Sequence, residues 1–528
     1  MPPIEFVVAL LVVTIPLVAI ARRIGIPYPV VLIVGGLVLG FVPELPPIEL
    51  NPDLVLVIFL PPLMYWESVT APTDEMRANA AWIWPMALGL VIATIIGVAL
   101  TGHAIVPGMG WAVAFTLGAI VAPTDEIAVA PTLERFSVPR HIIAIIEGES
   151  LLNDAGSLVI YAAAINAAVT DVFSWPSAVL HFLLAALGAI GIGLIAGWLA
   201  VEAWRRIQDP QLAMVISVVL PFVAYVPAQR LELSGVLAVV AAGVCVNRFT
   251  PTVITPATRL QATGFWETIV FLANVLIFTL VGLQLHAVLA ALSRYSVMTL
   301  VSYALIVNAV VIAIRFAWVF GQGYSSLFKR GGRSRVASEW KHLVIMAWSG
   351  PRGGVSLAAA LAIPMALAGG QPFPERDLLI FLTFSVILVT LVGAAVTLPA
   401  VVAWLKVEDD DVSEMEEKKA LVAMAAAAIA RVDELERRRQ LEPQIAGVLR
   451  RRYQRRKAHV ARNRGDVEAT HEDKVARQLV GAEQEILDAQ RSTLIDLRNR
   501  GEIDNVVLRH LQLILDMQQA QLDERSHI

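Results

Sequence analysis

The chain has 528 residues, of which 57% are apolar and only 16% are charged. A soluble globular protein is about 45–50% apolar and about 25% charged, so the composition excludes a wholly soluble protein. The net charge of −4 and the single cysteine argue against a basic nucleic-acid surface, a disulfide framework and a thiolate metal cluster. Residues 1–405 hold 19 Lys/Arg and 21 Asp/Glu, whereas residues 406–528 hold 22 and 24. We therefore expect a membrane domain over 1–405 and a water-exposed region over 406–528.

The first 405 residues predict an all-α polytopic membrane protein. A spanning helix needs about 20 mostly apolar residues, and thirteen segments meet or approach that length. The third is the weakest, because Pro61 and Pro62 interrupt it. In chain order the segments lie near 4–21, 26–42, 53–70, 79–100, 111–134, 140–169, 176–203, 210–228, 231–247, 264–289, 297–320, 341–366 and 376–405.

The loops between these segments predict the orientation of the chain. Loops after odd-numbered helices carry 14 basic residues, and loops after even-numbered helices carry 3. Basic residues are retained on the cytoplasmic side of a membrane. We therefore expect a multi-pass protein of the cell (inner) membrane, with its N-terminus outside and residues 406–528 in the cytoplasm.

The charged region from 406 to 528 is rich in helix-forming residues. Helical runs near 414–440, 442–464, 472–499 and 502–524 are separated at Pro443, Gly465 and Gly501. The segment 450–464 is basic enough to bind anionic lipid or an acidic regulator. The same charges also suit a solvated helix face in a small bundle.

Ionisable residues within the predicted spans are candidates for function, because a charge in the bilayer costs about 2.5–3.5 kcal/mol on insertion scales. The deeper ones are Glu67, Asp125, Glu126, Glu147, Glu149, Asp154 and Arg352. Glu202, Glu267 and Arg315 fall nearer to helix ends, and Arg315 is long enough to snorkel towards the interface.

The sixth segment has the most informative pattern. Ser150 and Asp154 are four residues apart, so they share one helix face, and Glu149 and Asn153 share the adjacent face. A carboxylate and a hydroxyl on one face are oxygen ligands suited to a hard cation. Arg352 is the evident intramembrane partner for Glu149, so we predict a structural ion pair between them and a functional role for Asp154.

Two predicted helices contain breaks. The fifth carries the sequence APTDE at 122–126, and the twelfth carries SGPRGG at 349–354. Proline removes a backbone donor and glycine permits non-helical dihedrals, so Pro123, Gly350, Pro351 and Gly353 mark the interruptions. Helices 1–6 and 8–13 would form an inverted repeat with the two breaks at matching positions. Such paired breaks are typical of the midplane binding site of a transporter.

An acidic side chain in a water-accessible cavity can hold a proton or a metal cation, and competition between them suffices for exchange. The sequence shows no phosphate-binding Walker motif and no HExxH motif, so we expect neither an enzyme nor an ATP-driven pump, and no cofactor. A cation channel gated by the tail and an ion sensor are the alternatives from other classes.

Four stretches resemble the monovalent cation:proton antiporter-1 family, which includes the NhaP and NHE sodium/proton exchangers. The first runs from Ala122 to Tyr161 and contains GESLLND. The others are FLPPLMYWES, FWETIVFLANVLIFTLVGLQL and WSGPRGGVSLAAALAIP. The resemblance covers residues 4–405 and implies a thirteen-helix fold, in which helices 1–3 and 7–10 form a dimerisation domain and helices 4–6 and 11–13 form a core. It also implies a homodimer in lipid.

The resemblance further implies site residues and an activity. It assigns Asp154, with Asn153 and Ser150, to alternating binding of cation and proton. It also makes the Thr124 backbone a cation ligand beside Asp125, places Glu67 at the site, and supports the Glu149–Arg352 pair. The single acid of the Asn-Asp motif implies electroneutral exchange of Na⁺ or Li⁺ for H⁺, with K⁺/H⁺ exchange as the alternative. Glu126 and Pro351 depart from the family pattern.

Overall fold

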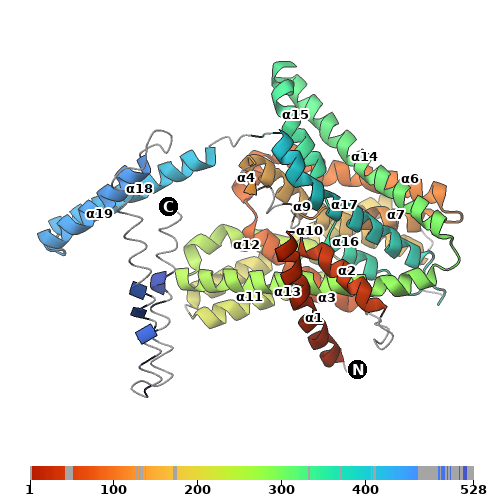
Figure 1. The fold of residues 1–528 in the computed structure, drawn as a ribbon, viewed down its shortest axis with the longest axis horizontal. Coiled ribbons are helices and arrows are strands. Elements are labelled where there is room, and N and C mark those ends of the chain that lie inside the picture. The colour runs from red at the N-terminus through yellow and green to blue at the C-terminus, as the bar shows by residue number, and fades with distance from the viewer. Residues whose placement is uncertain are drawn as a thin grey trace. The chain divides into compact units, whose positions relative to one another are not determined.

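The computed structural model describes residues 3–25, 27–41, 52–126, 138–170, 175–207, 209–330, 333–367, 370–405 and 412–461, with isolated residues at 129–136, 407 and 486–519. Within this part the chain is helical, and its one β contact is an isolated bridge between Ala366 and Pro372. The chain divides into two compact units, Met1–Asp410 and Asp411–Ile528 (Figure 1).

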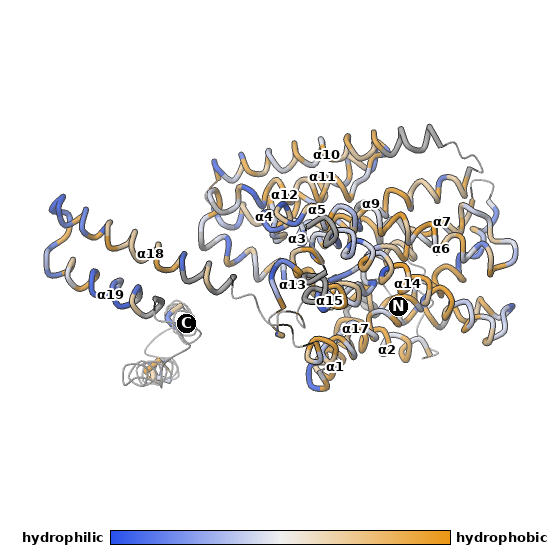
Figure 2. Tube along the Cα trace, turned by 90° about the horizontal axis from the view of Figure 1, so that it is seen from above, coloured by the Kyte–Doolittle hydropathy of each residue, from blue (hydrophilic) through white to orange (hydrophobic). Residues whose placement is uncertain are grey.

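Every predicted apolar segment of the first unit coincides with one or more helices. The hydropathy colouring of Figure 2 shows that apolar residues predominate along most of these helices. In chain order they are α1 (Pro3–Ile24), α2 (Tyr28–Gly40), α3 (Pro52–Thr70), α4 (Thr73–Ala78), α5 (Ala80–Trp84), the π-helical η1 (Pro85–Leu90), α6 (Val91–Ile105), α7 (Trp111–Val121), α9 (Arg140–Thr170), α10 (Trp175–Arg206), α11 (Pro210–Arg230), α12 (Gly235–Val253), α13 (Pro256–Ala291), α14 (Val297–Arg330), α15 (Arg333–Trp348), α16 (Gly354–Leu361) and α17 (Arg376–Leu405).

Seven helices of the described part are long and apolar enough to cross a membrane. Four further apolar helices, including α2 and α7, are shorter. Contrary to the expected interruption, α3 continues through Pro61 and Pro62. Residues 60–65 of this helix are buried, and tertiary packing of that kind outweighs the unfavourable local propensity of proline.

Small residues bring pairs of helices into close contact in the first unit. In the pair α2–α13, a side chain at Gly36 would meet the carbonyl of Thr279, and one at Gly282 would meet the carbonyl of Ile33. In the pair α10–α12, Gly193 lies in the same way against the backbone of α12. Glycine at such positions permits close contact between the two backbones. Van der Waals packing of this kind drives helix association in a membrane, because lipid tails are as apolar as the helices and leave no hydrophobic driving force.

The second unit contains an antiparallel helical hairpin of α18 (Val412–Arg437) and α19 (Pro443–Ala461). Ala425, Val432 and Ala446 are buried between the two helices. The predicted helices over 472–499 and 502–524, and the breaks at Gly465 and Gly501, lie outside the described residues apart from isolated positions.

The α2–α13 contact predicts a position-specific cost of added volume. Replacing Gly282 with valine should lower the free energy of unfolding by about 1–3 kcal/mol or more, because the neighbouring backbone cannot move aside. A side chain added at Gly264 of the same helix would meet nothing within 4 Å, so Gly264→Val is the matched control. Thermal unfolding of both variants in detergent tests the contact, and equal melting temperatures would contradict it.

Candidate functional site

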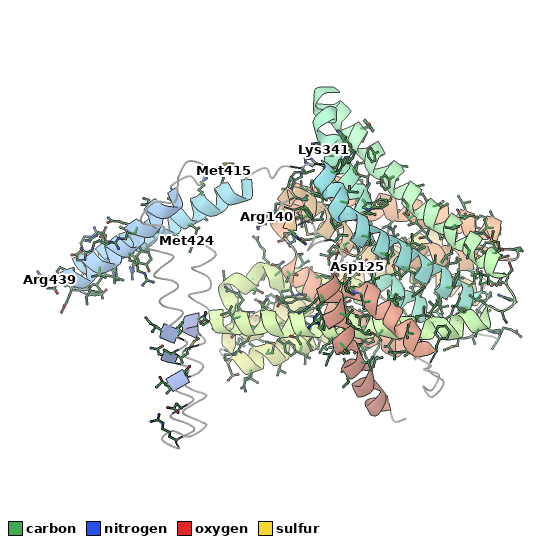
Figure 3. All side chains as sticks on the ribbon, in the orientation of Figure 1. Asp125, Arg140, Lys341, Met415, Met424 and Arg439 are labelled. Atoms are coloured by element: carbon green, nitrogen blue, oxygen red, sulfur yellow. The ribbon has the colours of Figure 1, made fainter. Side chains whose placement is uncertain are left out.

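The two interrupted helices meet at their breaks, as the sequence predicts. Residues 122–126 follow α7 without helical structure, and residues 349–353 separate α15 from α16. The backbone N–H of Asp125 donates to the carbonyl of Pro351 at 2.8 Å. Asp125 is half-buried and is labelled among the helices of the first unit in Figure 3. The crossing therefore joins two segments more than 200 residues apart through a direct backbone hydrogen bond.

Asp125 satisfies the N-terminus of α16. Its Oδ2 accepts a hydrogen bond from the backbone N–H of Gly354, the first residue of that helix, at 3.0 Å. A negative charge is favourable there, because helix N-termini carry unpaired N–H groups and a partial positive charge. Gly353 lies so close that a side chain would overlap the Asp125 carboxylate. Asp125, from the first break, thus caps the N-terminus of α16, which follows the second break.

Arg352 satisfies carbonyl groups at the crossing. Its guanidinium donates from Nε to the carbonyl of Val121, the last residue of α7, at 3.0 Å, and from Nη1 to the carbonyl of Gly350. Its backbone N–H donates to the hydroxyl of Thr390 on α17 at 3.0 Å. A cation at a helix C-terminus complements the partial negative charge of that end. Arg352 is only 2% exposed, so its hydrogen bonds replace solvent.

The predicted Glu149–Arg352 ion pair is wrong, because Glu149 pairs with Arg315 instead. Arg315 on α14 donates from Nη1 to Glu149 Oε1 at 2.5 Å and from Nη2 to Oε2 at 3.0 Å. This bidentate geometry gives a strong, directional pair between two side chains that are 3% and 1% exposed. Arg315, which the sequence placed near a helix end and long enough to snorkel, is the partner of Glu149 that the sequence did not identify.

Arg315 also caps the broken end of α15. Its Nε donates to the carbonyl of Ala347 at 3.0 Å, and Nη2 donates to that of Met346 at 3.0 Å. Gly350 approaches the guanidinium so closely that a side chain there would collide with it. One arginine therefore joins α9, α14 and the end of α15. Its position in the final third of the predicted eleventh span gave no signal of this geometry.

The face of α9 that carries Glu149, Ser150 and Asn153 holds Thr124 of the first break. Ser150 Oγ donates to the Thr124 carbonyl at 2.7 Å, and Asn153 Nδ2 donates to Thr124 Oγ1 at 2.7 Å. The Thr124 hydroxyl lies 3.4 Å from Glu149 Oε1, and its N–H lies 3.5 Å from Asn153 Oδ1. Three side chains, through four contacts, thus fix the non-helical backbone at Thr124 against α9.

Asp154 lies one turn after Ser150 on α9 and is 3% exposed. Its Oδ1 is buried and has no hydrogen-bond partner among the residues that the structure describes. A buried carboxylate oxygen without a partner is costly unless a proton or a cation compensates it. The arrangement therefore leaves Asp154 able to bind either, whereas Glu149 and Asp125 already have their partners.

Two further acids approach Asp154. Glu67 on α3 and Glu126 at the first break each carry a buried carboxylate oxygen that no described residue hydrogen-bonds. Glu67 interacts electrostatically with Glu126, Asp154 and Asp125. The structure thus brings together Glu67, Thr124, Asp125, Ser150, Asn153 and Asp154. Within the described residues no three His, Cys, Asp or Glu side chains could together hold a metal ion.

Residues 7–404 match the family model described as sodium/hydrogen exchanger, transmembrane. The chain belongs to the sodium/hydrogen exchanger family. It is therefore a multi-pass membrane protein and a secondary transporter rather than an enzyme, and membership supports cation/proton antiport.

Two relatives match this chain along nearly its whole length, and a third matches three quarters of it. An uncharacterised Na⁺/H⁺ exchanger of Mycobacterium tuberculosis is 34% identical over 98% of this chain and 95% of its own. An uncharacterised Na⁺/H⁺ exchanger of Escherichia coli is 30% identical over 99% of both. A sodium, potassium, lithium and rubidium/H⁺ antiporter of Bacillus subtilis is 34% identical over 75% of this chain and 61% of its own.

The fold of the exchanger is that of a solved antiporter. The sodium proton antiporter MjNhaP1 of Methanocaldococcus jannaschii superposes with a TM-score of 0.62 and 20% identity, covering 77% of this chain and 99% of that one. At this identity the likeness establishes the fold alone.

The pairing of Glu149 with Arg315 predicts a large stability effect in the exchanger. Arg315→Leu should lower the free energy of unfolding by about 3–5 kcal/mol, because it leaves a buried carboxylate unpaired. Glu149→Leu in the same chain should recover much of the loss. Denaturant titrations of the single and double variants give the coupling energy. A larger coupling between Glu149 and Arg352 than between Glu149 and Arg315 would contradict the assignment.

The crossing predicts opposite outcomes at two neighbouring glycines. Gly353→Ala should lower the melting temperature and abolish cation-driven proton movement, because its methyl group would displace the Asp125 carboxylate. At Gly354 the added methyl would lie 3.4 Å from Asn274 Oδ1, an ordinary contact, so Gly354→Ala is the matched control. If both variants transport at the wild-type rate, the close approach at Gly353 is unimportant.

Proposed function

We propose that this protein exchanges Na⁺ or Li⁺ for H⁺ across the cell membrane by alternating access, with Asp154 carrying cation and proton in turn. The observation that carries the proposal is the buried Oδ1 of Asp154, which lies beside the crossing of two broken helices and has no hydrogen-bond partner in the described part of the chain. The neighbouring carboxylates Asp125 and Glu149 accept hydrogen bonds from protein groups, whereas Asp154, Glu67 and Glu126 each keep a buried oxygen without a partner among the described residues. Of these three, Asp154 shares a helix face with Ser150, whose hydroxyl hydrogen-bonds to the Thr124 carbonyl, so we take Asp154 as the acid that a transported ion would neutralise.

The cation would bind at Asp154, the Ser150 hydroxyl and the backbone of Thr124. Ser150 Oγ donates its proton to the Thr124 carbonyl, which leaves hydroxyl lone pairs for a cation. Asn153 positions Thr124 through its amide. A proton on Asp154 would remove the negative charge that attracts the cation, so the two ions exclude each other. One carboxylate neutralised by one monovalent ion gives electroneutral, one-for-one exchange.

The remaining charged groups would hold the site in place. Asp125 and Arg352 cap the half-helices, and Glu149 with Arg315 ties α9 to α15. Glu67 on α3 would face the site from the other domain and interact with whichever ion is bound. Glu126, where proline is common in the family, would add a negative charge and shift the competition between cation and proton.

We propose the finer architecture on the same basis. Thirteen spans would form inverted repeats, with helices 1–3 and 7–10 as a dimerisation domain and helices 4–6 and 11–13 as the moving core of a homodimer in lipid. The crossing of α7 with the segment between α15 and α16 supports the repeat, because both breaks meet at one point. The N-terminus would lie outside the inner membrane. Residues 406–528 would form a cytoplasmic regulatory region that binds a regulator or anionic lipid, and no cofactor is involved.

Potassium is the alternative cation. The Bacillus subtilis and Bacillus pumilus relatives, at 34% and 36% identity, are named as antiporters of sodium, potassium, lithium and rubidium. A carboxylate, a hydroxyl and a backbone carbonyl are oxygen ligands that any of these ions accepts. This ligand set supports a broad cation range in the present chain as well.

Asp154→Asn should abolish cation-driven proton movement while leaving the protein folded, because the amide cannot carry a negative charge. The measurement is the recovery of the fluorescence of a pH-sensitive dye in proteoliposomes, to which Na⁺, Li⁺, K⁺ or Rb⁺ is added in turn. Repeating it under an imposed voltage separates electroneutral exchange from channel-like or electrogenic movement.

The matched control is Asp74→Asn. The Asp74 side chain lies on α4, is 84% exposed and forms no ion pair or hydrogen bond with a described residue of the site. This variant should exchange at the wild-type rate. Unchanged exchange in Asp154→Asn would overturn the assignment of Asp154 as the carrier.

A further inference from the structure

Helix α19 presents one face away from α18, and this face has an unusual composition. Ile445, Val448, Arg451, Arg452 and Arg455 follow the spacing of three, four and seven residues that places side chains on one side of a helix. All five are exposed, with Ile445 at 49% and Val448 at 58%. We call this set the arginine face. Ala446 lies on the opposite side, where it is fully buried against α18.

The charges of the arginine face are not neutralised within the described hairpin. Arg450, on the side towards α18, pairs with Asp433 at 2.5 Å and with Glu436 at 2.6 Å. These hydrogen bonds raise the pKa of the Arg450 guanidinium. Arg451, Arg452 and Arg455 form no ion pair with any described residue, and α19 itself contains no acidic residue. The hairpin therefore separates one paired arginine from three unpaired ones.

The two apolar residues of the face add a second property. Ile445 and Val448 lie at the N-terminal end of the face and the arginines follow them. A helix with apolar side chains and arginines on one exposed side suits an interface that offers hydrocarbon and phosphate together. Guanidinium groups bind phosphate oxygens through two parallel hydrogen bonds and are less strongly hydrated than ammonium groups. An acidic protein surface would satisfy the charges but leave the apolar pair unused.

We propose that the arginine face docks on the surface of an anionic phospholipid bilayer. The proposal rests on the proposed function in one respect, the cytoplasmic location of residues 406–528. A bilayer surface is within reach of the tail, because α18 begins only seven residues after the end of the apolar helix α17. Each basic residue near an anionic membrane surface contributes about fivefold to binding, so three contribute about a hundredfold.

Docking can be measured in the full-length exchanger reconstituted in vesicles. A polarity-sensitive fluorophore is attached at Gln444→Cys, an exposed position on the same side of α19, in a Cys245→Ser background. The probes are vesicles of phosphatidylcholine alone and vesicles that also contain phosphatidylglycerol, each with a lipid-borne quencher. We expect quenching only with phosphatidylglycerol, and we expect added salt to reduce it.

The test variant replaces Arg451, Arg452 and Arg455 with glutamine. It should lower the ratio of docked to undocked tail by about a hundredfold while the helix content is unchanged. The matched control, Arg431→Gln with Arg437→Gln and Arg438→Gln, removes the same charge from exposed positions in and directly after α18 and should dock normally. Two of these arginines already pair with Glu434.

The outcomes separate docking from transport. Asp154→Asn, which should not exchange ions, should dock as the wild type does, so loss of the proposed transport leaves the docking result intact. Equal quenching in both vesicle types, or equal loss in test and control variants, would overturn the proposal. A response to soluble polyglutamate without a response to phosphatidylglycerol would also overturn it, in favour of an acidic protein partner.

Discussion

The structure of the site depends on one constraint, the need to satisfy unwound backbone away from water. Breaking two helices inside a membrane exposes N–H and C=O groups that lipid cannot pair. Three charged side chains meet this need at the crossing. Asp125 accepts from the start of α16, Arg352 donates to the end of α7, and Arg315 donates to the end of α15. Each charge has the sign that complements the helix end beside it.

The same constraint explains why only some acids in the region are available to ions. Glu149 is occupied by Arg315 and Asp125 by a helix N-terminus, so both act as fixed parts of the scaffold. Asp154 differs from both because none of the described residues supplies a hydrogen bond to its Oδ1. A protein that moves an ion must bind it reversibly, and an oxygen left unpaired by the scaffold can do so. Asp125 and Glu149 thus serve the scaffold, and the Asp154 oxygen is left for the proposed ion.

Much of this organisation could be predicted from the sequence. Apolar length located the helices, the APTDE and SGPRGG stretches located the breaks, and the spacing of Ser150, Asn153 and Asp154 placed them on adjacent faces of one helix. The partner of Glu149 could not be predicted in this way. Arg315 and Arg352 lie 166 and 203 positions away, and hydropathy alone made Arg315 a candidate for snorkelling. The direction of a side chain between packed helices has no local signal.

By itself the sequence determined what period and composition encode: apolar spans, a charged helical region after them, and a family motif that covers the membrane domain. Only the tertiary structure decided which charges meet. It assigned Arg315 to Glu149, turned Arg352 towards carbonyl groups, and separated Arg450, which is paired, from the exposed Arg451, Arg452 and Arg455. The physical reason is that helix formation follows local propensity, whereas ion pairing in a low-dielectric interior depends on ångström-scale distances between distant segments.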